Sequence, residues 1–140
     1  MKFKYFLLVL MVLFVISIGA VSAADLNETT LESSNTQGTF DDLQVQINDA
    51  SEGSVLDLDM DYAGHYGSRI QFNKNLTIDG HGHTLDCLKE RGCSAFYSKT
   101  GVITLKNLRI INAHNDFNNR GGAIHIEGSA KYVLENCIFE

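Results

Sequence analysis

The sequence has no proline, and its 140 residues include only three cysteines and 11 basic side chains. Because acidic residues number 17, the formal net charge is −6 at pH 7. This charge argues against binding to nucleic acid or to an anionic membrane surface, since both require a basic patch that the sequence lacks. Without proline, sharp corners must be formed by the 12 glycines and by asparagine and aspartate, which tolerate positive φ.

A short strand motif, apolar–polar–apolar, recurs between residues 54 and 140. Residues 76–78, 103–105 and 132–134 form one column, with steps of 27 and 29 residues. Two further columns have similar steps, and they comprise residues 70–72, 96–98 and 124–126, and residues 56–58, 83–85, 108–110 and 137–139. Three strand columns that share a period of about 27 residues are typical of a parallel β-helix, in which each coil adds one strand to each of three sheets.

Alternate apolar side chains in these columns are expected to face the interior of the coil. The predicted core consists of Leu56, Leu58, Ile70, Phe72, Leu76, Ile78, Leu85, Phe96, Ile103, Leu105, Leu108, Ile110, Ile124, Ile126, Leu134 and Phe139. This core is sufficient for one domain of about three coils. The general preference for right-handed crossovers predicts a right-handed coil.

The first 23 residues have the features of a secretory signal peptide. Lys2 and Lys4 precede an apolar run, and Val21, Ser22 and Ala23 supply small residues where a signal peptidase cleaves. The run approaches the length of a membrane-spanning helix, so a retained anchor is the alternative. We expect cleavage after Ala23, export, and membrane contact only through this signal helix.

Two segments separate the signal peptide from the first strand. Residues 24–38 are rich in polar residues without an apolar period, which predicts a flexible leader. Residues 39–53 are expected to form an amphipathic helix, with Thr39 as its N-cap and Asp42 three residues later. Its apolar face comprises Phe40, Leu43, Ile47 and Ala50. Because it directly precedes the first strand, we expect the helix to cap the β-helix of residues 54–140.

Cysteines and glycosylation sequons provide local expectations. Cys87 and Cys93 flank a five-residue loop, and in an exported protein a disulfide between them is reasonable, although spacing alone leaves their geometry open. Cys137 lies in a column and is interpreted as a small buried residue. Asn27 and Asn75 each begin an Asn-x-Thr sequon and are candidate glycosylation sites.

Polar residues recur at the corner that follows residues 76–78, 103–105 and 132–134. The corner contains Gly80, Asn107 and Asn136 in turn. Stacked asparagines hydrogen-bond along such an axis through their amides, which predicts an asparagine ladder. Gly80 has no side-chain amide, so we expect the ladder to start one coil later, at Asn107.

Several motifs resemble those of known surface proteins. Residues 121–124 (Gly-Gly-Ala-Ile) and 136–139 (Asn-Cys-Ile-Phe) resemble the G-G-A-I and F-x-x-N repeats of polymorphic outer-membrane adhesins. Residues 39–43 (Thr-Phe-Asp-Asp-Leu) and 76–85 (Leu-Thr-Ile-Asp-Gly-His-Gly-His-Thr-Leu) resemble the first coils of adhesin-like surface proteins of methanogenic archaea. The resemblance implies a right-handed parallel β-helix of the pectin-lyase-like class.

The resemblance also implies that further coils follow. The sequence stops at Glu140, before an F-x-x-N motif beginning at Phe139 is complete. An uncovered last coil would expose strand edges and apolar side chains. We therefore expect a truncated protein or a piece of a longer one, with C-terminal coils or another subunit covering the open end.

The pectin-lyase-like class also includes enzymes, so carbohydrate cleavage is an alternative. Residues 80–82 (Gly-His-Gly) match a polygalacturonase tripeptide. However, the only adjacent Asp pair, Asp41 and Asp42, lies in the expected helix, and the segment around Arg109 lacks the lysine of those enzymes. Without paired carboxylates there is no general acid and base to assign, so no catalytic residue is expected.

Metal binding is not expected from the spacing of the ligand-type residues. Asp57, Asp59 and Asp61 alternate as in a calcium loop, but Leu58 and Met60 between them are interpreted as core, which indicates a solvated acidic edge. Four histidines are the other candidate metal ligands, but the strand columns do not bring them together. They are His81, His83, His114 and His125.

Two groups of polar side chains are candidate ligand contacts. One is a polar loop and the other is an outward-facing column of the sheets, and loops of this kind often carry recognition. The candidates are Asn115, Asp116, Asn118 and Asn119 in the loop, and Gln71, Tyr97 and His125 in the column. A plain solvent-facing sheet is the alternative interpretation.

The sequence therefore predicts a non-catalytic, exported segment of an adhesin-like surface protein, in which a β-helix presents loops to a cell-surface glycan or protein. The expected location is extracellular or at the cell surface, with no cofactor. A truncated pectate lyase or polygalacturonase-like enzyme and a purely structural spacer are the alternatives.

Overall fold

The structure is a computed structural model that describes residues 36–114 and 121–140. The predicted signal peptide (residues 1–23), most of the predicted leader and the sequon at Asn27 lie outside the described residues.

The described chain contains one helix, α2 (Phe40–Asp49), and twelve short strands. The strands are β1 (Gly38–Thr39), β2 (Val55–Asp57), β3 (Tyr62–Ala63), β4 (Arg69–Gln71), β5 (Leu76–Asp79), β6 (Thr84–Asp86), β7 (Ser94–Ser98), β8 (Val102–Lys106), β9 (Arg109–Ile111), β10 (Ile124–Ile126), β11 (Lys131–Glu135) and β12 (Ile138–Phe139).

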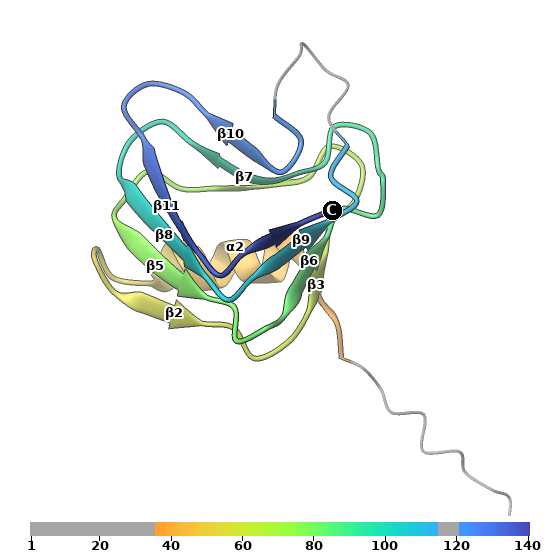
Figure 1. Cartoon of the computed structure of the whole chain (residues 1–140), viewed down its shortest axis with the longest axis horizontal. Helices are drawn as coiled ribbons and strands as arrows, with labels where there is room; N and C mark the ends of the chain where they lie inside the picture. The colour runs from red at the N-terminus through yellow and green to blue at the C-terminus, as the bar shows by residue number, and fades with distance from the viewer. Residues whose placement is uncertain (1–35, 115–120) are drawn as a thin grey trace, which may run out of the picture. The chain divides into compact units, whose positions relative to one another are not determined.

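The strands form three sheets, ordered β1-β3-β6-β9-β12, β11-β8-β5-β2 and β10-β7-β4. Every strand pair in these sheets is parallel. The chain visits the three sheets in turn, giving three complete coils and two strands of a fourth. Successive coils approach the viewer in Figure 1 while the chain runs counterclockwise from β5 through β6 to β7, so the β-helix is right-handed. The predicted fold class is confirmed.

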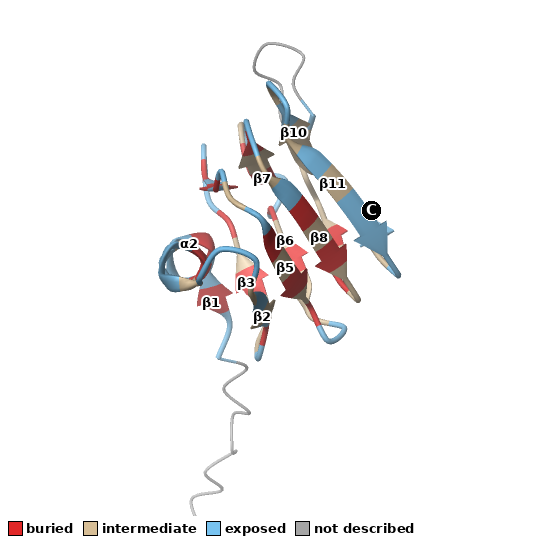
Figure 2. Ribbon diagram, turned by 90° about the vertical axis from the view of Figure 1, so that its left-hand side faces the viewer, coloured by how far each residue is buried: buried red, intermediate tan, exposed pale blue. Residues whose placement is uncertain are grey.

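Helix α2 covers the first coil, as predicted. Thr39 is its N-cap, and a capping box joins Thr39 and Asp42: the Asp42 backbone N–H donates to Thr39 Oγ1, and the Thr39 backbone N–H donates to Asp42 Oδ2. Phe40, Leu43 and Ile47 are buried against the strand core. The helix ends at Asp49, before the expected stop at residues 51–53. Figure 2 shows α2 at one end of the stack of coils.

The core is continuous up to β9 and open at the last three strands, β10, β11 and β12. Eleven of the sixteen predicted core residues are buried, whereas Leu56 and Ile124 are partly buried. Ile126, Leu134 and Phe139 are 48%, 47% and 42% exposed, so their predicted burial is wrong in this chain. These residues belong to the last strands β10, β11 and β12, whose outer edges have no neighbouring coil in the described chain. Figure 2 shows this end as mostly exposed, next to the buried middle coils.

One column assignment is also wrong. The sequence pattern groups residues 56–58 with residues 83–85, but β2 pairs with β5, which places Leu56 opposite Ile78. The strand opposite Leu85 contains Tyr62, which is fully buried and absent from the predicted core. The step from Leu56 to Ile78 is only 22 residues, so a period of about 27 extrapolated backwards reaches the wrong sheet.

Within residues 36–114 and 121–140, no helix is long and apolar enough to cross a membrane.

Candidate functional site

The corner between β5 and β6 is longer than the corresponding corner of the next coil. Asp79 pairs with Lys106 and Thr84 pairs with Arg109, so four residues on one coil face two on the next. The extra length is accommodated by a turn in which His81 has φ 48° and Gly82 has φ 90°. This left-handed turn displaces His81 from the strand path, toward the coil that precedes it.

His81 lies beside two carboxylates from neighbouring coils. Asp57 ends β2 and Asp79 ends β5, and the two residues are register partners. His81 Nε2 is 2.8 Å from Asp57 Oδ1, and His81 Nδ1 is 3.9 Å from Asp79 Oδ1. One donor atom from each of the three residues lies within 4.8 Å of the other two. We call Asp57, Asp79 and His81 the histidine corner.

The carboxylates of the histidine corner favour the charged form of His81, and hydrogen bonds favour the charged form of Asp79. The hydrogen bond with Asp57 raises the pKa of His81, and the negative charge of Asp79 raises it further. A hydrogen bond from Asn107 lowers the pKa of Asp79, with a smaller effect from the His81 backbone N–H. Asp79 is therefore held as a carboxylate.

The predicted asparagine ladder is present, and its hydrogen bonds extend one coil further, to Asp79. Asn136 Nδ2 donates to Asn107 Oδ1 at 2.8 Å, and Asn107 Nδ2 donates to Asp79 Oδ1 at 3.0 Å. The asparagine ladder starts at Asn107, as predicted from Gly80, and the Asp79 carboxylate supplies a further acceptor in the preceding coil. Both asparagines have left-handed φ, at 49° and 52°.

A second polar stack was missed by the sequence analysis. Asn112, with φ 56°, donates through Nδ2 to Asp86 Oδ1 at 2.8 Å. The Leu88 backbone N–H donates to the same oxygen at 2.7 Å. An asparagine directly after the strand that ends at residue 111 was the available signal.

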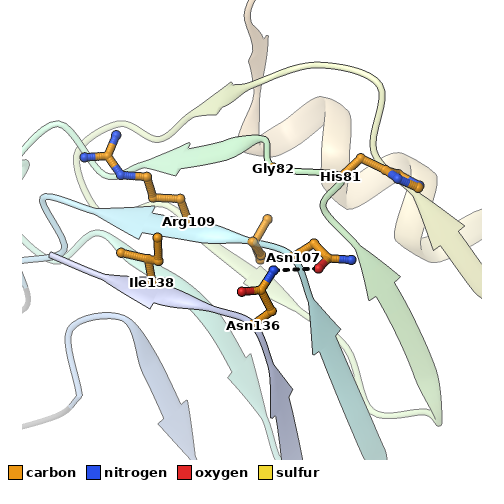
Figure 3. A pocket seen from close by; sticks show the side chains of 7 residues that line it. His81, Gly82, Asn107, Arg109, Asn136 and Ile138 are labelled. Carbon is orange, nitrogen blue, oxygen red and sulfur yellow. Dashed lines mark hydrogen bonds between the residues drawn. The ribbon is translucent and has the colours of Figure 1, made fainter.

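A groove of about 470 Å³ adjoins the histidine corner. It is lined by His81, Gly82, Asn107, Leu108, Arg109, Asn136 and Ile138. Figure 3 shows His81 at one end, the Arg109 guanidinium at the other, and the bonded asparagines Asn107 and Asn136 between them. Arg109 is paired with Glu140. Leu108 and Ile138 therefore give the groove an apolar part beside the polar side chains of its other lining residues.

The acidic residues noted in the sequence have roles beyond the one expected. Asp57 binds His81, and Asp61 accepts from the Thr84 backbone N–H at 2.8 Å while lying 3.1 Å from His83 Nδ1. Asp57 and Asp59 are exposed, as the interpretation of a solvated acidic edge expects, but Asp57 and Asp61 also contact histidines of the next coil.

The four histidines do not converge on one point. His81 and His83 both follow β5, whereas His125 lies in β10 of another sheet. His114 forms an isolated backbone bridge with Cys93. Contacts of one histidine with two carboxylates were missed because they depend on the turn at residues 80–83.

The predicted outward column is present on the sheet β10-β7-β4. Gln71, Tyr97 and His125 are register partners, and we call them the aromatic stripe. The residues that precede them, Ile70 and Phe96, are fully buried, so the alternation is as predicted. The Tyr97 and His125 rings are 5.0 Å apart between centroids and tilted by 52°.

Charged groups surround Tyr97. Arg69 Cζ lies 5.2 Å from the centre of the Tyr97 ring, and Lys99 Nζ lies 5.8 Å from it. The Tyr97 hydroxyl donates to Glu127 Oε2 at 2.8 Å, and Glu127 also pairs with Lys99 at 3.6 Å. These contacts hold Tyr97 in one orientation on the outer face.

The other members of the aromatic stripe have more constrained positions. The His125 side chain is only 12% exposed, so it supports Tyr97 more than it offers contact. The Gln71 backbone exchanges two hydrogen bonds with the Gln44 side chain of α2. The predicted loop contacts, Asn115, Asp116, Asn118 and Asn119, lie outside the described residues.

Cys87 and Cys93 are fully buried free thiols in hydrogen-bond contact with each other. This contact raises the pKa of Cys87 and lowers that of Cys93, and Ser68 Oγ also lies 3.4 Å from the Cys93 sulfur. The disulfide stays a prediction. Cys137 is partly buried and donates to the Leu105 carbonyl at 3.3 Å.

Asn75 is exposed at the start of β5, and its Oδ1 accepts from the Val102 backbone N–H at 2.7 Å. Its glycosylation stays a prediction.

Comparisons of the chain with protein families, with curated proteins and with solved structures gave no match.

Proposed function

We propose that this chain is a non-catalytic, exported segment of an adhesin-like surface protein. Its β-helix holds the aromatic stripe as a contact surface for a glycan. Export follows from the signal features of residues 1–23, and the coil architecture supplies a rigid support on which such a surface can be displayed.

The observation that carries this proposal is the register of Gln71, Tyr97 and His125 across three coils. An aromatic ring offers an apolar face for the C–H groups of a sugar, and its polar neighbours offer hydrogen bonds to hydroxyl groups. Arg69 and Lys99 are exposed beside Tyr97 and favour a ligand with acidic groups. The stripe follows the coil axis, which suits an extended polymer.

The end of the stack formed by β10, β11 and β12 is the second contact surface in this proposal. Ile126, Leu134 and Phe139 are exposed there, beside the open edges of these strands. Further coils of the same kind would pair with these edges and bury the apolar side chains. We propose that such coils, from a longer chain or another subunit, cover this end.

Carbohydrate cleavage remains the second candidate, because the histidine corner brings two carboxylates close to His81, which lines the groove. A glycosidase needs one carboxyl group protonated as the general acid, which requires a raised pKa. The pKa of Asp79 is lowered instead. Asp79 is therefore unsuited to the general-acid role.

The test is binding of the purified chain to an array of neutral and acidic polysaccharides. Tyr97→Ala is expected to weaken binding to the captured polysaccharide at least about fivefold, since loss of a stacked base–aromatic contact costs about 1 to 3 kcal/mol in nucleic-acid recognition. Tyr66→Ala is the matched control, because Tyr66 is an exposed tyrosine outside the stripe.

Absence of binding to every polysaccharide, or equal binding by the Tyr97 variant, would reject the aromatic stripe as the contact surface. Release of unsaturated or reducing sugar from polygalacturonate, abolished by His81→Ala, would replace this proposal with the enzymatic one.

A further inference from the structure

The histidine corner brings together the side-chain types that bind transition metals. It contributes one imidazole and two carboxylates, from Asp57 at the end of β2, Asp79 at the end of β5 and His81 in the following turn. Ligands around one zinc ion with bonds of about 2.0 to 2.2 Å lie roughly 3.5 Å apart. Since the three donor atoms already lie within 4.8 Å of one another, small side-chain rotations are enough to close on an ion.

We propose that the histidine corner is a binding site for a divalent transition metal of the zinc class. This inference does not depend on the proposed glycan contact, which lies on a different sheet.

The positions of the three ligands are constrained by their surroundings. Asp79 Oδ1 accepts hydrogen bonds from Asn107 Nδ2 at 3.0 Å and from the His81 backbone N–H at 3.1 Å. These bonds orient the carboxylate and leave its second oxygen as a donor to a metal. Asp57 and His81 are exposed enough for an ion to reach them, with side chains 66% and 54% exposed.

The types of ligand atom in the histidine corner indicate which metal ion it would bind. Calcium prefers six to eight oxygen ligands, whereas imidazole with carboxylates suits zinc and its neighbours. Lys106, whose charge acts on Asp79, is paired with Glu135 at 3.1 Å, which reduces its competition for Asp79. Three protein ligands leave a fourth position for water or an anionic group next to the groove.

The experiment is isothermal titration of the full chain with zinc chloride after chelator treatment. We expect about one equivalent of zinc to bind, and Asp57→Asn and His81→Asn each to weaken binding more than tenfold, because each removes a direct ligand. Asparagine at position 81 keeps the left-handed φ accessible, and position 57 lies in a strand without such strain. Circular dichroism checks that both variants fold.

His65→Gln is the matched control. His65 lies 3.4 Å from Asp41 in another exposed histidine–aspartate pair that lacks a second carboxylate in the metal-ligand set. This variant is expected to bind zinc as the unchanged chain does. Loss of binding in His65→Gln, with retention in His81→Asn, would overturn the proposal.

A cobalt titration separates the histidine corner from the buried thiols. Cobalt bound by oxygen and nitrogen gives no sulfur-to-metal charge-transfer band, whereas binding to Cys87 or Cys93 would produce one. We expect no such band at one equivalent. A charge-transfer band that persists in His81→Asn, absence of zinc binding, or calcium binding as tight as zinc binding would each contradict the proposed site.

Discussion

Asp79 is the residue that connects the turn, the ladder and the histidine corner. Its Oδ1 accepts from Asn107 and from the His81 backbone, and its charge faces the His81 ring. Asn107 has the corresponding role in the next coil, since it donates to Asp79 and accepts from Asn136. A single amide at a corner therefore links three coils along the axis.

Replacing Asn107 is expected to destabilise the fold. Asn107→Ala removes two hydrogen bonds worth about 1 kcal/mol each. It also replaces asparagine, which tolerates the left-handed φ of 49°, with alanine, for which this conformation costs up to about 1 to 2 kcal/mol more. We expect a loss of about 2 to 4 kcal/mol in the free energy of unfolding, measured by urea denaturation. Asn107→Gly keeps the φ accessible and should lose less than Asn107→Ala. Equal stability of both variants and the unchanged chain would show that the ladder contributes nothing.

The capping box of α2 is expected to make stability depend on acidity. Hydrogen bonds from Thr39 lower the pKa of Asp42. Because folding lowers this pKa, the stabilisation is present above the ordinary aspartate pKa of about 3.9 and is lost as the pH falls through the lowered value. Asp42→Asn should reduce the change in melting temperature between about pH 5 and pH 2.

Asp41→Asn is the control for this measurement, since Asp41 lies in the same helical turn but outside the capping box. If Asp42→Asn and the unchanged chain lost melting temperature in parallel on acidification, Asp42 would not be a source of the acid sensitivity.

At the scale of elements, the strands and the helix were predictable and the corners were not. Period-two apolar residues identified the strands around Ile70, Leu76 and Leu105, and Thr39 with Asp42 identified the helix start. The length of each coil could not be predicted, because a corner changes length without altering the strand pattern. Because the first coil is short, the sequence period assigns Leu56 to the wrong column. Because the corner at His81 is long, the sequence pattern does not predict the contacts of the histidine corner.

The loop between β6 and β7 carries a further prediction. Cys87 and Cys93 are in hydrogen-bond contact on either side of this loop. Oxidation by a disulfide reagent such as oxidised glutathione is expected to join them, each thiol losing its proton as the reagent is reduced. Mass spectrometry of the chain should show the loss of two hydrogens, and proteolysis should locate the bond to residues 87 and 93.

Cys137→Ser should leave this oxidation unchanged, because Cys137 donates to the Leu105 carbonyl rather than to either thiol. Formation of a bond from Cys137 to Cys87 or Cys93 in the unchanged chain would contradict the local pairing.

Residues 36–114 and 121–140 form a stack of coils whose two ends differ in burial. Helix α2 covers the first coil, whereas apolar side chains of the last coil are exposed. Leu105 and Leu134 show the difference directly, because they are register partners that are 0% and 47% exposed. The sequence pattern predicted both as core, since a strand motif does not reveal whether another coil lies above it.

These two leucines allow the open end to be measured. Leu105→Ala is expected to cost about 2 to 5 kcal/mol of unfolding free energy, and Leu134→Ala should cost less than about 1.5 kcal/mol, because half of its side chain is already in water. Denaturation at several protein concentrations provides the check. Equal costs at high concentration would mean that a second copy covers the last coil.

The most direct test of the proposed surface function is antibody labelling of intact cells of the source organism, with an antibody raised against residues 39–140. We predict labelling of unbroken cells that disappears after protease is added outside them, together with a band in the cell-envelope fraction. Labelling that appears only after lysis, with the protein recovered in the cytosolic fraction, would contradict an exported adhesin-like segment.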